Sequence, residues 1–264
     1  MSVEGSTMVV TGAASGIGAA TATLGRSLGA RVIGLDRAAS ADDLVTVDLA
    51  DRTSIDAVLD TLPDKIDALC NVAGVPGTCP PEMVLAVNLL GLRHLTEALV
   101  DRLPVGGSVV NVASTAGSEW MSVMEPIAEL LATADMADGL AWFERSAPLM
   151  PAYNFSKAAL LVYSMRMAWA WRGRGVRVNS VSPGPVETPI LPDFRVSMGE
   201  SLLDSVSALV GRNGRPEEIA RVVCFLADPD ASWVSGCNVV VDGGFFGAVA
   251  SGALDLASMM KEKA

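Results

Sequence analysis

Histidine is almost absent from this chain, and its scarcity excludes several classes of active site. The 264 residues include a single histidine, His94. A histidine-rich metal site is therefore excluded, and a Ser-His-Asp hydrolase would have to use this one residue. The four cysteines have no metal-ligand spacing, so reduced, packed thiols are expected. We predict no metal site and interpret His94 as a helix-surface or packed residue.

Positive charge is also scarce, and no apolar run has the length that spans a membrane. Lys and Arg number 19 against 30 Asp and Glu, a net charge of −11 that disfavours binding to a nucleic-acid backbone. No uninterrupted apolar stretch of about 18 residues occurs, and the N-terminus lacks a basic region followed by an apolar run. We therefore expect a cytoplasmic protein with no nucleic-acid or membrane partner.

Half of the residues are hydrophobic and 19% are charged, so a large core is available. Seven short apolar runs alternate with helix-length segments, and almost every run ends in a Gly, Asp, Asn or Ser cluster. This alternation is typical of βαβ units with a parallel sheet. It predicts one α/β domain over 1–264, a doubly wound seven-stranded parallel sheet (Rossmann fold) whose ligands bind beyond the carboxyl ends of the strands. The strands are expected at 8–10, 31–35, 44–47, 68–72, 108–112, 176–181 and 238–241, and the helices at 16–29, 53–62, 82–102, 151–173 and 216–227.

One long segment interrupts this alternation. Residues 118–150 are rich in apolar side chains, and Ile127, Leu130, Leu131 and Ala134 have helical spacing. A connection this long and apolar is either a lid over a hydrophobic substrate or a subunit contact, and both alternatives stay open. We also expect a substrate loop at 190–210. The tail 245–264 could cover this chain's pocket, cover a neighbour's pocket, or be frayed.

The N-terminal strand leads into a glycine-rich turn, Thr11–Gly18. Glycines at a strand-to-helix turn allow a tight bend and close backbone approach to a pyrophosphate, and the following helix N-terminus attracts the anion. The turn therefore predicts a dinucleotide site. Its candidate cofactor-binding residues are Gly12, Ser15, Gly16, Ile17 and Gly18.

Asp36 ends the second expected strand, 18 residues after Gly18. A carboxylate there can accept hydrogen bonds from the adenosine ribose hydroxyls and would repel a 2′-phosphate. Arg37 is a competing signal because its guanidinium could pair with that phosphate. We expect NAD rather than NADP, with Asp48 and Leu49 near the adenine.

Tyr153 and Lys157 are four residues apart in an expected helix, so their side chains share one face. With the glycine-rich turn, this pair indicates that a nucleotide cofactor and an acid/base pair share one site. An unperturbed phenol has a pKa of about 10, and lowering it to about 7 requires about 4 kcal/mol. One cation at about 4 Å supplies about that much at an effective dielectric near 20. Lys157 is the candidate cation, and an oxidised nicotinamide ring would add another.

With these motifs in order, the chain resembles the short-chain dehydrogenase/reductase family over nearly its whole length. Further matches are Asn71-Val72-Ala73-Gly74, Asn88, Ser114, Pro183 to Thr188, Arg215 to Ile219, and Asp242-Gly243-Gly244. Val72 departs from the family, which commonly has a second Asn there. Within the family the chain resembles two groups of bacterial members, the coniferyl-alcohol dehydrogenases and the 3α-hydroxysteroid dehydrogenases/carbonyl reductases.

The resemblance implies a role for each matching residue. Tyr153 would be the general acid/base, Lys157 would also hold the nicotinamide ribose, Ser114 would position the reacting oxygen, and Asn88 would hold a water linking Lys157 to solvent. Further cofactor contacts would come from Asn71, Ala73, Gly74, Pro183, Gly184, Val186 and Thr188. An apolar substrate pocket is expected from Trp120, Met121, Met124, Phe155, Ile190, Leu191 and Phe194.

The sequence thus predicts an NAD-dependent oxidoreductase that interconverts a hydrophobic, ring-bearing alcohol and its ketone or aldehyde. Two alternatives stay open. Sugar-nucleotide epimerases and dehydratases share the Tyr–Lys pair but space the glycine turn differently, whereas nucleotide-sensing regulators commonly lose the Tyr or the Lys. The family usually forms dimers or tetramers, so a homodimer or homotetramer is expected.

Overall fold

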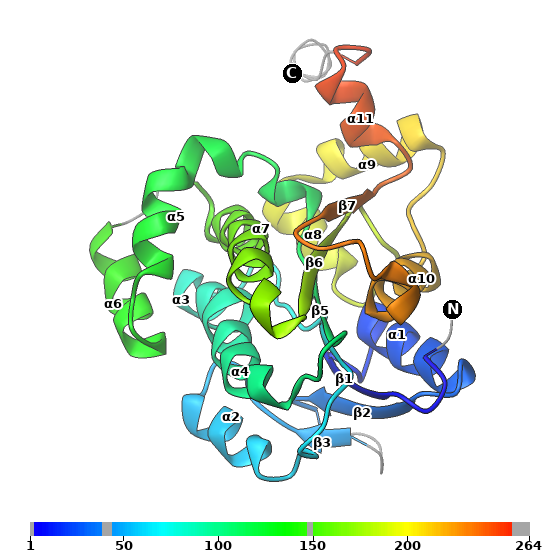
Figure 1. Ribbon diagram of the computed structural model, residues 1–264. Helices are drawn as coiled ribbons and strands as arrows, with labels where there is room; N and C mark the ends of the chain where they lie inside the picture. Colours follow the sequence, from blue (N-terminus) through cyan, green and yellow to red (C-terminus); the bar gives the residue numbers. More distant parts are fainter. Residues whose placement is uncertain (1–2, 39–43, 147–149, 255–264) are drawn as a thin grey trace.

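A computed structural model describes residues 3–38, 44–146 and 150–254, and its centre is a seven-stranded parallel sheet (Figure 1). The strand order is β3-β2-β1-β4-β5-β6-β7, and every pairing is parallel. The predicted doubly wound fold is confirmed. The strands are β1 (Thr7–Thr11), β2 (Arg31–Asp36), β3 (Leu44–Thr46), β4 (Ala68–Asn71), β5 (Ser108–Val112), β6 (Arg177–Pro183) and β7 (Asn238–Val241).

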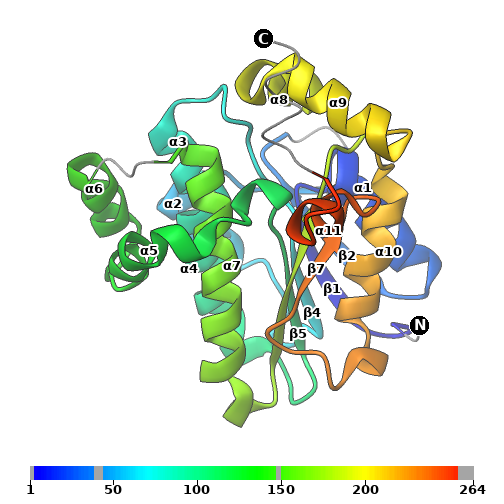
Figure 2. The same cartoon turned by 90° about the horizontal axis from the view of Figure 1, so that it is seen from above.

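Helices cover both faces of this sheet (Figure 2). On one face α1 packs against α10, and on the other α2 and α4 pack together beside α7. The helices are α1 (Gly16–Ser27), α2 (Arg52–Leu59), α3 (Pro81–Leu85), α4 (Gly91–Leu99), α5 (Met124–Leu131), α6 (Met136–Ser146), α7 (Ala152–Ala170), α8 (Leu191–Met198), α9 (Glu200–Val210), α10 (Pro216–Ala227) and α11 (Phe245–Ala250). The shorter 3₁₀ turns are Val100–Arg102, Thr115–Gly117, Trp120–Val123, Arg172–Arg174 and Pro229–Ala231.

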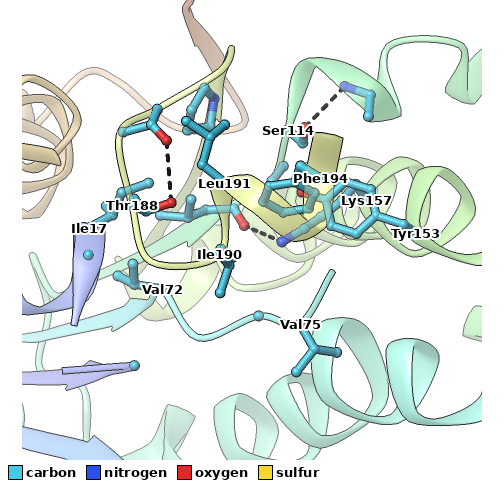
Figure 3. A pocket seen from close by; sticks show the side chains of 18 of the residues that line it. Ile17, Val72, Val75, Ser114, Tyr153, Lys157, Thr188, Ile190, Leu191 and Phe194 are labelled. Carbon is cyan, nitrogen blue, oxygen red and sulfur yellow. Dashed lines mark hydrogen bonds between the residues drawn. The ribbon is translucent and has the colours of Figure 1, made fainter. Parts of the chain in front are cut away.

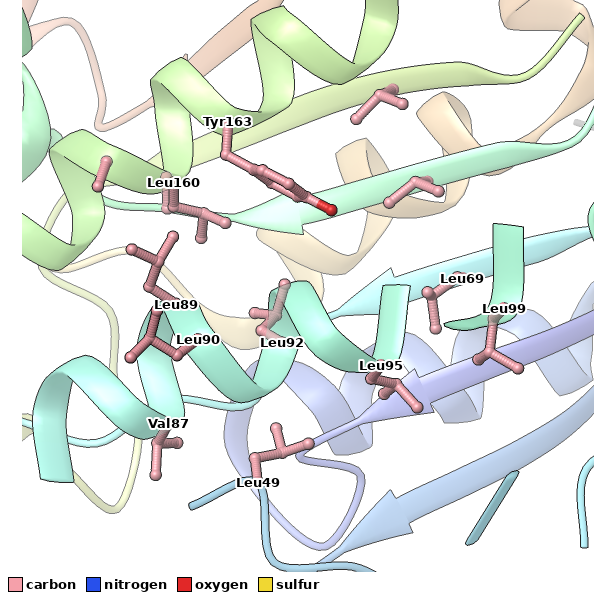
Figure 4. Packing of buried hydrophobic residues seen from close by; sticks show 14 of the residues in the cluster. Leu49, Leu69, Val87, Leu89, Leu90, Leu92, Leu95, Leu99, Leu160 and Tyr163 are labelled. Carbon is pink, nitrogen blue, oxygen red and sulfur yellow. The ribbon is translucent and has the colours of Figure 1, made fainter. Parts of the chain in front are cut away.

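Successive side chains of a strand enter opposite faces of the sheet, which divides the core in two. In β1, Val9 belongs to the cluster beneath α2, α4 and α7, while Met8 and Val10 belong to the cluster beneath α1 and α10. Figure 4 shows part of the larger cluster, in which leucines of α4 and the preceding turn face Leu160 and Tyr163 of α7. Burial on both faces explains why the central strands β1, β4 and β5 are rich in apolar residues.

The expected helix at 82–102 is a composite. A π-helical turn, Ala86–Leu90, joins α3 to α4, and it contains Asn88. Within the described residues, Pro81–Arg102 is the one helical stretch long and apolar enough to cross a membrane by length and composition. Of the apolar 18-residue window within this stretch, 72% is buried inside the protein, so the core accounts for its apolar character.

The 118–150 segment forms α5 and α6, which lie at one side of the molecule (Figure 1). Helix α5 contacts α7, and α6 contacts α3 and the π-helical turn. Ile127 and Leu130 of α5 and Trp142 of α6 are buried in the larger core cluster. The apolar residues that mark this segment in the sequence therefore extend the core beside α7.

Candidate active site

A cavity of about 800 Å³ opens beyond the carboxyl ends of the strands. Its lining comes from the ends of β1, β2, β4, β5 and β6, and from α7, α8, α9 and α11. It lies where the chain order reverses, since β2 and β3 lie on one side of β1 and the later strands on the other. A doubly wound sheet binds its ligands at that reversal. Figure 3 shows Tyr153, Lys157 and Phe194 gathered at one end of the cavity, with Ile17 and Val72 at the other.

The glycine-rich turn forms the floor of the cofactor end. A Cβ on Gly12 would lie 2.8 Å from the Ala73 Cα, and a Cβ on Gly18 would lie 2.0 Å from the Gly12 carbonyl oxygen. Helix α1 begins at Gly16 with no side-chain cap and no acidic residue in its first turn. Its first N–H groups therefore face the cavity without a competing anion, and the turn fits a pyrophosphate. All five candidate residues of the turn line the cavity.

The adenosine end contains the predicted carboxylates. Asp36 lies at the end of β2, where its Oδ2 accepts a hydrogen bond from the Ala14 N–H at 3.0 Å. The Asp48 Oδ1 accepts from the Ala50 N–H at 2.9 Å. Arg37 lines the cavity as well, so the two opposing cofactor signals meet in one place. Leu49 also lines it, and beside it lie three apolar residues that we did not predict: Leu35, Val47 and Val87.

Two loops complete the cofactor-binding end. The Thr11 Oγ1 accepts hydrogen bonds from the N–H groups of Val72 and Ala73, which ties the β1 end to the loop after β4. A Cβ on Gly16 would lie 3.2 Å from the Thr188 Cγ2, so the loop after β6 lies against the glycine-rich turn. Of the residues predicted in these loops, the cavity is lined by Ala73, Gly74, Pro183, Gly184, Val186 and Thr188.

The predicted acid/base pair lies on a single face of α7. Both side chains line the cavity although they are 8% (Tyr153) and 4% (Lys157) exposed. The Lys157 Nζ lies 5.8 Å from the centre of the Tyr153 ring and donates a hydrogen bond to the Val112 carbonyl at 2.9 Å. Ser114, at the end of β5, lines the same cavity, and its Oγ accepts from the Ala116 N–H at 3.1 Å.

Burial dominates the electrostatics of this pair. It raises the pKa of Tyr153 to about 12, with hydrogen bonding to Ser114 as an opposing, smaller effect. It lowers the pKa of Lys157 to about 8. The chain without its cofactor therefore does not lower the Tyr153 pKa, and the combined effect of Lys157 and an oxidised nicotinamide ring stays a prediction. The reason is that loss of solvent disfavours the phenolate, while the Lys157 ammonium is directed at the Val112 carbonyl.

Asn88 lies behind this pair rather than on the cavity surface. Its Oδ1 accepts from the Val75 N–H at 2.8 Å, and its Nδ2 donates to the Val75 carbonyl at 3.0 Å. A Cβ on Gly74 would lie 3.2 Å from the Asn88 Oδ1 and 3.5 Å from the Lys157 Nζ, so the loop backbone passes close to both side chains. Asn88 thus fixes the loop beside Lys157, and its water-holding role stays a prediction.

Besides Asn88, five predicted site residues do not line the cavity. Asn71 is buried and donates from its Nδ2 to the Thr96 Oγ1 at 2.9 Å and the Asn111 Oδ1 at 2.8 Å, so its side chain ties core elements together. Met121 is 72% exposed. Trp120 and Met124 pack against the larger core cluster.

The prediction that Phe155 lines the substrate pocket is wrong. It is fully buried, and its ring stacks on Trp142 of the insert with ring centres 6.0 Å apart. Two residues along a helix correspond to about 200° of rotation, so Phe155 enters the core on the face of α7 opposite Tyr153. Of the segment 118–150, only Ser118 and Glu119 among the described residues line the cavity, and the lid and subunit-contact alternatives both stay predictions.

The substrate end is apolar and is built largely by the 190–210 region. Ile190, Leu191 and Phe194 line it as predicted, and the Phe194 ring lies 5.0 Å from the Tyr153 ring. Further lining residues come from the 190–210 region and from the 245–264 segment, for which the sequence left a role over this chain's own pocket as one alternative. They are Ser197, Met198, Leu203, Val206, Phe245, Phe246 and Val249, with Glu119 and Asn154 as polar neighbours.

Two family models match the chain: the short chain dehydrogenase model over residues 6–126 and the Enoyl-(Acyl carrier protein) reductase model over residues 140–246. Among curated relatives, the coniferyl-alcohol dehydrogenase of Pseudomonas sp. (strain HR199 / DSM 7063) is 42% identical, with 92% of this chain and 98% of that protein covered. The 3-alpha-hydroxysteroid dehydrogenase/carbonyl reductase of Comamonas testosteroni is 34% identical, with coverage of 90% and 96%.

A solved structure agrees with these relatives. The 3-alpha-hydroxysteroid dehydrogenase from Pseudomonas sp. B-0831, complexed with NADH, superposes with a TM-score of 0.81 at 33% identity and covers 95% of this chain and 100% of its own. The resemblance stated from the sequence is thereby confirmed, including both groups of bacterial members. The chain belongs to the short-chain dehydrogenase/reductase family and is an oxidoreductase that acts on alcohols with a nicotinamide cofactor.

Proposed function

We propose that this enzyme is an NAD(H)-dependent dehydrogenase that interconverts a secondary, aryl or allylic alcohol and its ketone or aldehyde on a hydrophobic, ring-bearing substrate. The observation that carries the substrate class is the apolar end of the cavity beside Tyr153. There Ile190, Leu191 and Phe194 face the acid/base residue, and the Phe194 ring contacts the Tyr153 ring. An apolar pocket of this kind favours a ring over a polyol or a charged chain.

The charges of the lining support the same substrate class. Among the described residues that line the cavity, the only cationic side chains are Arg37 and Lys157. Arg37 adjoins Asp36 at the adenosine end, and Lys157 belongs to the acid/base pair. A phosphorylated or carrier-linked substrate would need further cations near the substrate end, as charge-assisted pairing with phosphate requires. Uncharged, ring-bearing alcohols need none.

Asp36 supports NAD as the cofactor. Its carboxylate is oriented by the N–H groups of Ala14 and Ala38, which accounts for one acceptor site on each oxygen and leaves the others for ribose hydroxyls. A 2′-phosphate in that position would be repelled by the same carboxylate. Arg37 would attract a 2′-phosphate more weakly, because its side chain is exposed to solvent at the rim of the cavity.

The chemistry follows from the acid/base pair. The bound cofactor supplies hydride transfer and, when oxidised, a positive charge; the turn 11–18, Asp36 and the loop 183–188 would hold it. In ketone reduction, the Tyr153 hydroxyl donates its proton to the carbonyl oxygen, and its pKa of about 12 keeps it protonated at neutral pH. Ser114 hydrogen-bonds the same oxygen and positions it. The protonated Lys157 stabilises the phenolate that forms.

A cofactor-exchange experiment tests the cofactor assignment. Asp36→Asn removes the negative charge and keeps a carbonyl acceptor, so the preference for NADH over NADPH is expected to fall at least about tenfold, or about 1.4 kcal/mol. The measurement is kcat/KM for both cofactors with one cyclic ketone. Asp48→Asn is the matched control, which changes a carboxylate at the same end and should leave the ratio within about twofold. A wild-type preference for NADPH would contradict the proposal.

An alcohol and ketone panel tests the substrate class. Cyclic and aryl alcohols should be oxidised with higher kcat/KM than linear polyols or carrier-linked substrates. Equal or better turnover of carrier-linked ketones would overturn the assignment.

A further inference from the structure

Helix α11, the last helix among the described residues, forms part of the cavity wall of its own chain. Phe245, Phe246 and Val249 line the cavity, and all three are half-buried. The other side of this short helix, at Gly247 and Ala250, is exposed. Figure 1 places α11 just beyond the end of β7 and beside α9. One face of α11 therefore presents two aromatic rings and a valine to the interior of the cavity.

The turn that precedes α11 fixes its position. The Asp242 Oδ1 accepts from the Gly244 N–H at 2.9 Å, and its Oδ2 accepts from the Phe246 N–H at 2.6 Å. Gly243 and Gly244 have φ of 71° and 94°, a region that favours glycine. The chain thus reverses sharply after the edge strand β7, and one carboxylate holds the first turn of α11. The Asp242 hydrogen bonds and the two glycines therefore set the direction of α11.

Helix α9 packs against this turn. A Cβ on Gly243 would lie 2.2 Å from the Val210 Cγ1, so the turn lies directly against the end of α9. Leu203 and Val206 of the same helix are buried and line the cavity, three residues apart on one face. Helices α9 and α11 thereby form one continuous apolar wall.

The chemistry of this wall indicates what it contacts. Phe245, Phe246 and Val249 have no polar side-chain atom with which to bind the phosphates, riboses or carboxamide of a nucleotide. They adjoin α9, which follows α8, and α8 brings Phe194 to the Tyr153 ring. A half-buried aromatic ring that faces a cavity gains most by packing against another apolar surface. From the Tyr153 end, the ring system of the substrate offers such a surface.

We propose that α11 is a specificity-determining wall, in which Phe245 and Phe246 contact the part of a ring-bearing substrate distant from the reacting carbon. The wall selects polycyclic or extended aromatic alcohols over single small rings, because α11 contacts α9 while Phe194 of α8 contacts Tyr153, so a ring system has to extend past Phe194 to reach α11. This inference rests on the proposed function. It adds a substrate contact from a part of the chain that follows the last strand of the sheet.

The test compares a large and a small alcohol in two variants. Phe245→Ala/Phe246→Ala removes both rings, whereas Ala250→Ser changes the exposed side of the same helix. We expect kcat/KM for a polycyclic alcohol to fall about tenfold in the double variant and that for cyclohexanol to stay within about twofold. Calorimetric binding of the polycyclic alcohol to the NADH complex, which does not turn over, should weaken by the same factor. The double variant should bind NADH with the affinity of the wild type. Ala250→Ser should match the wild type in kcat/KM for both alcohols.

Other outcomes are equally informative. If kcat/KM of the double variant fell equally for both alcohols, did not change, or rose for the polycyclic alcohol, α11 would not be a specificity-determining wall. If the double variant melts early, Phe245→Leu and Phe246→Leu retain apolar volume and should lose only part of the discrimination. If the wild type oxidises neither alcohol, the proposed function fails, and the calorimetric comparison still decides whether α11 contacts an apolar ring.

Discussion

At the scale of single residues, burial determines what each candidate can do. Tyr153, Lys157, Ser114 and Asp36 could be placed from motifs, because Asp36 and Ser114 lie at strand ends and the other two are four residues apart on one helix. Their pKa values could not, since desolvation depends on the packing of distant elements around α7. Phe155 was misplaced because its neighbour Trp142 comes from the insert, which no local pattern connects to it.

Lys157 gives a pH prediction. Its pKa is lowered from 10.5 to about 8, so above pH 8 the folded protein loses the ammonium that stabilises the Tyr153 phenolate. For ketone reduction, kcat/KM should fall about tenfold per pH unit above about 8. A profile that stays flat to pH 10 would refute this role. The free energy of unfolding has the opposite pH dependence. Between about pH 8 and 10.5 the unfolded state binds more protons at Lys157 than the folded state does. The contribution of Lys157 to stability therefore rises with pH in this range.

Alanine variants of Phe155 and Phe194 should have different effects, the first on stability and the second on substrate binding. Phe155→Ala leaves a cavity in the core and should cost about 3–5 kcal/mol of unfolding free energy, measured by denaturant titration. Phe194→Ala removes a half-buried ring from the substrate end, so it should raise KM for a cyclic ketone with a smaller loss of stability. If Phe155→Ala changed KM while stability stayed constant, the assignment of its ring to the core would be wrong.

At the scale of elements, the sequence predicted all seven strands, because each is a short segment with valine, leucine or isoleucine between turn residues. Helices α8, α9 and α11 were not predicted as helices. Their apolar faces are completed by the cavity and by each other, so short segments such as Phe245–Ala250 show little periodicity of their own. The π-helical turn at Asn88 was missed as well, since no composition marks a π-helix.

The glycine-rich turn gives a prediction at this scale. In Gly18→Ala the new Cβ would meet the Gly12 carbonyl oxygen at 2.0 Å, which forces the turn and α1 apart. We expect a loss of about 1–3 kcal/mol in stability and at least about tenfold weaker NADH binding. Gly173→Ala is the matched control, because a Cβ there meets nothing within 4 Å. Thermal melting and NADH titration of both variants measure the effect. Unchanged NADH affinity in Gly18→Ala would show that the turn does not hold the cofactor.

At the scale of the whole molecule, the strand order places every functional segment at one edge of the sheet. Segments far apart in sequence, from the Thr11–Gly18 turn to α11, meet there because parallel strands present their carboxyl ends together. The side position of α5 and α6 leaves the subunit-contact interpretation of the insert as a prediction, together with the expected dimer or tetramer. Light scattering of the purified enzyme tests the latter.

The central claim is that Tyr153 exchanges the proton with the substrate oxygen in a nucleotide-binding cavity. The most direct measurement compares NADH consumption with a cyclic ketone by the wild type and by Tyr153→Phe, with NADH affinity measured for both. The account predicts a loss of about 10²- to 10⁴-fold in kcat with unchanged NADH binding. Equal rates for the two proteins would contradict it.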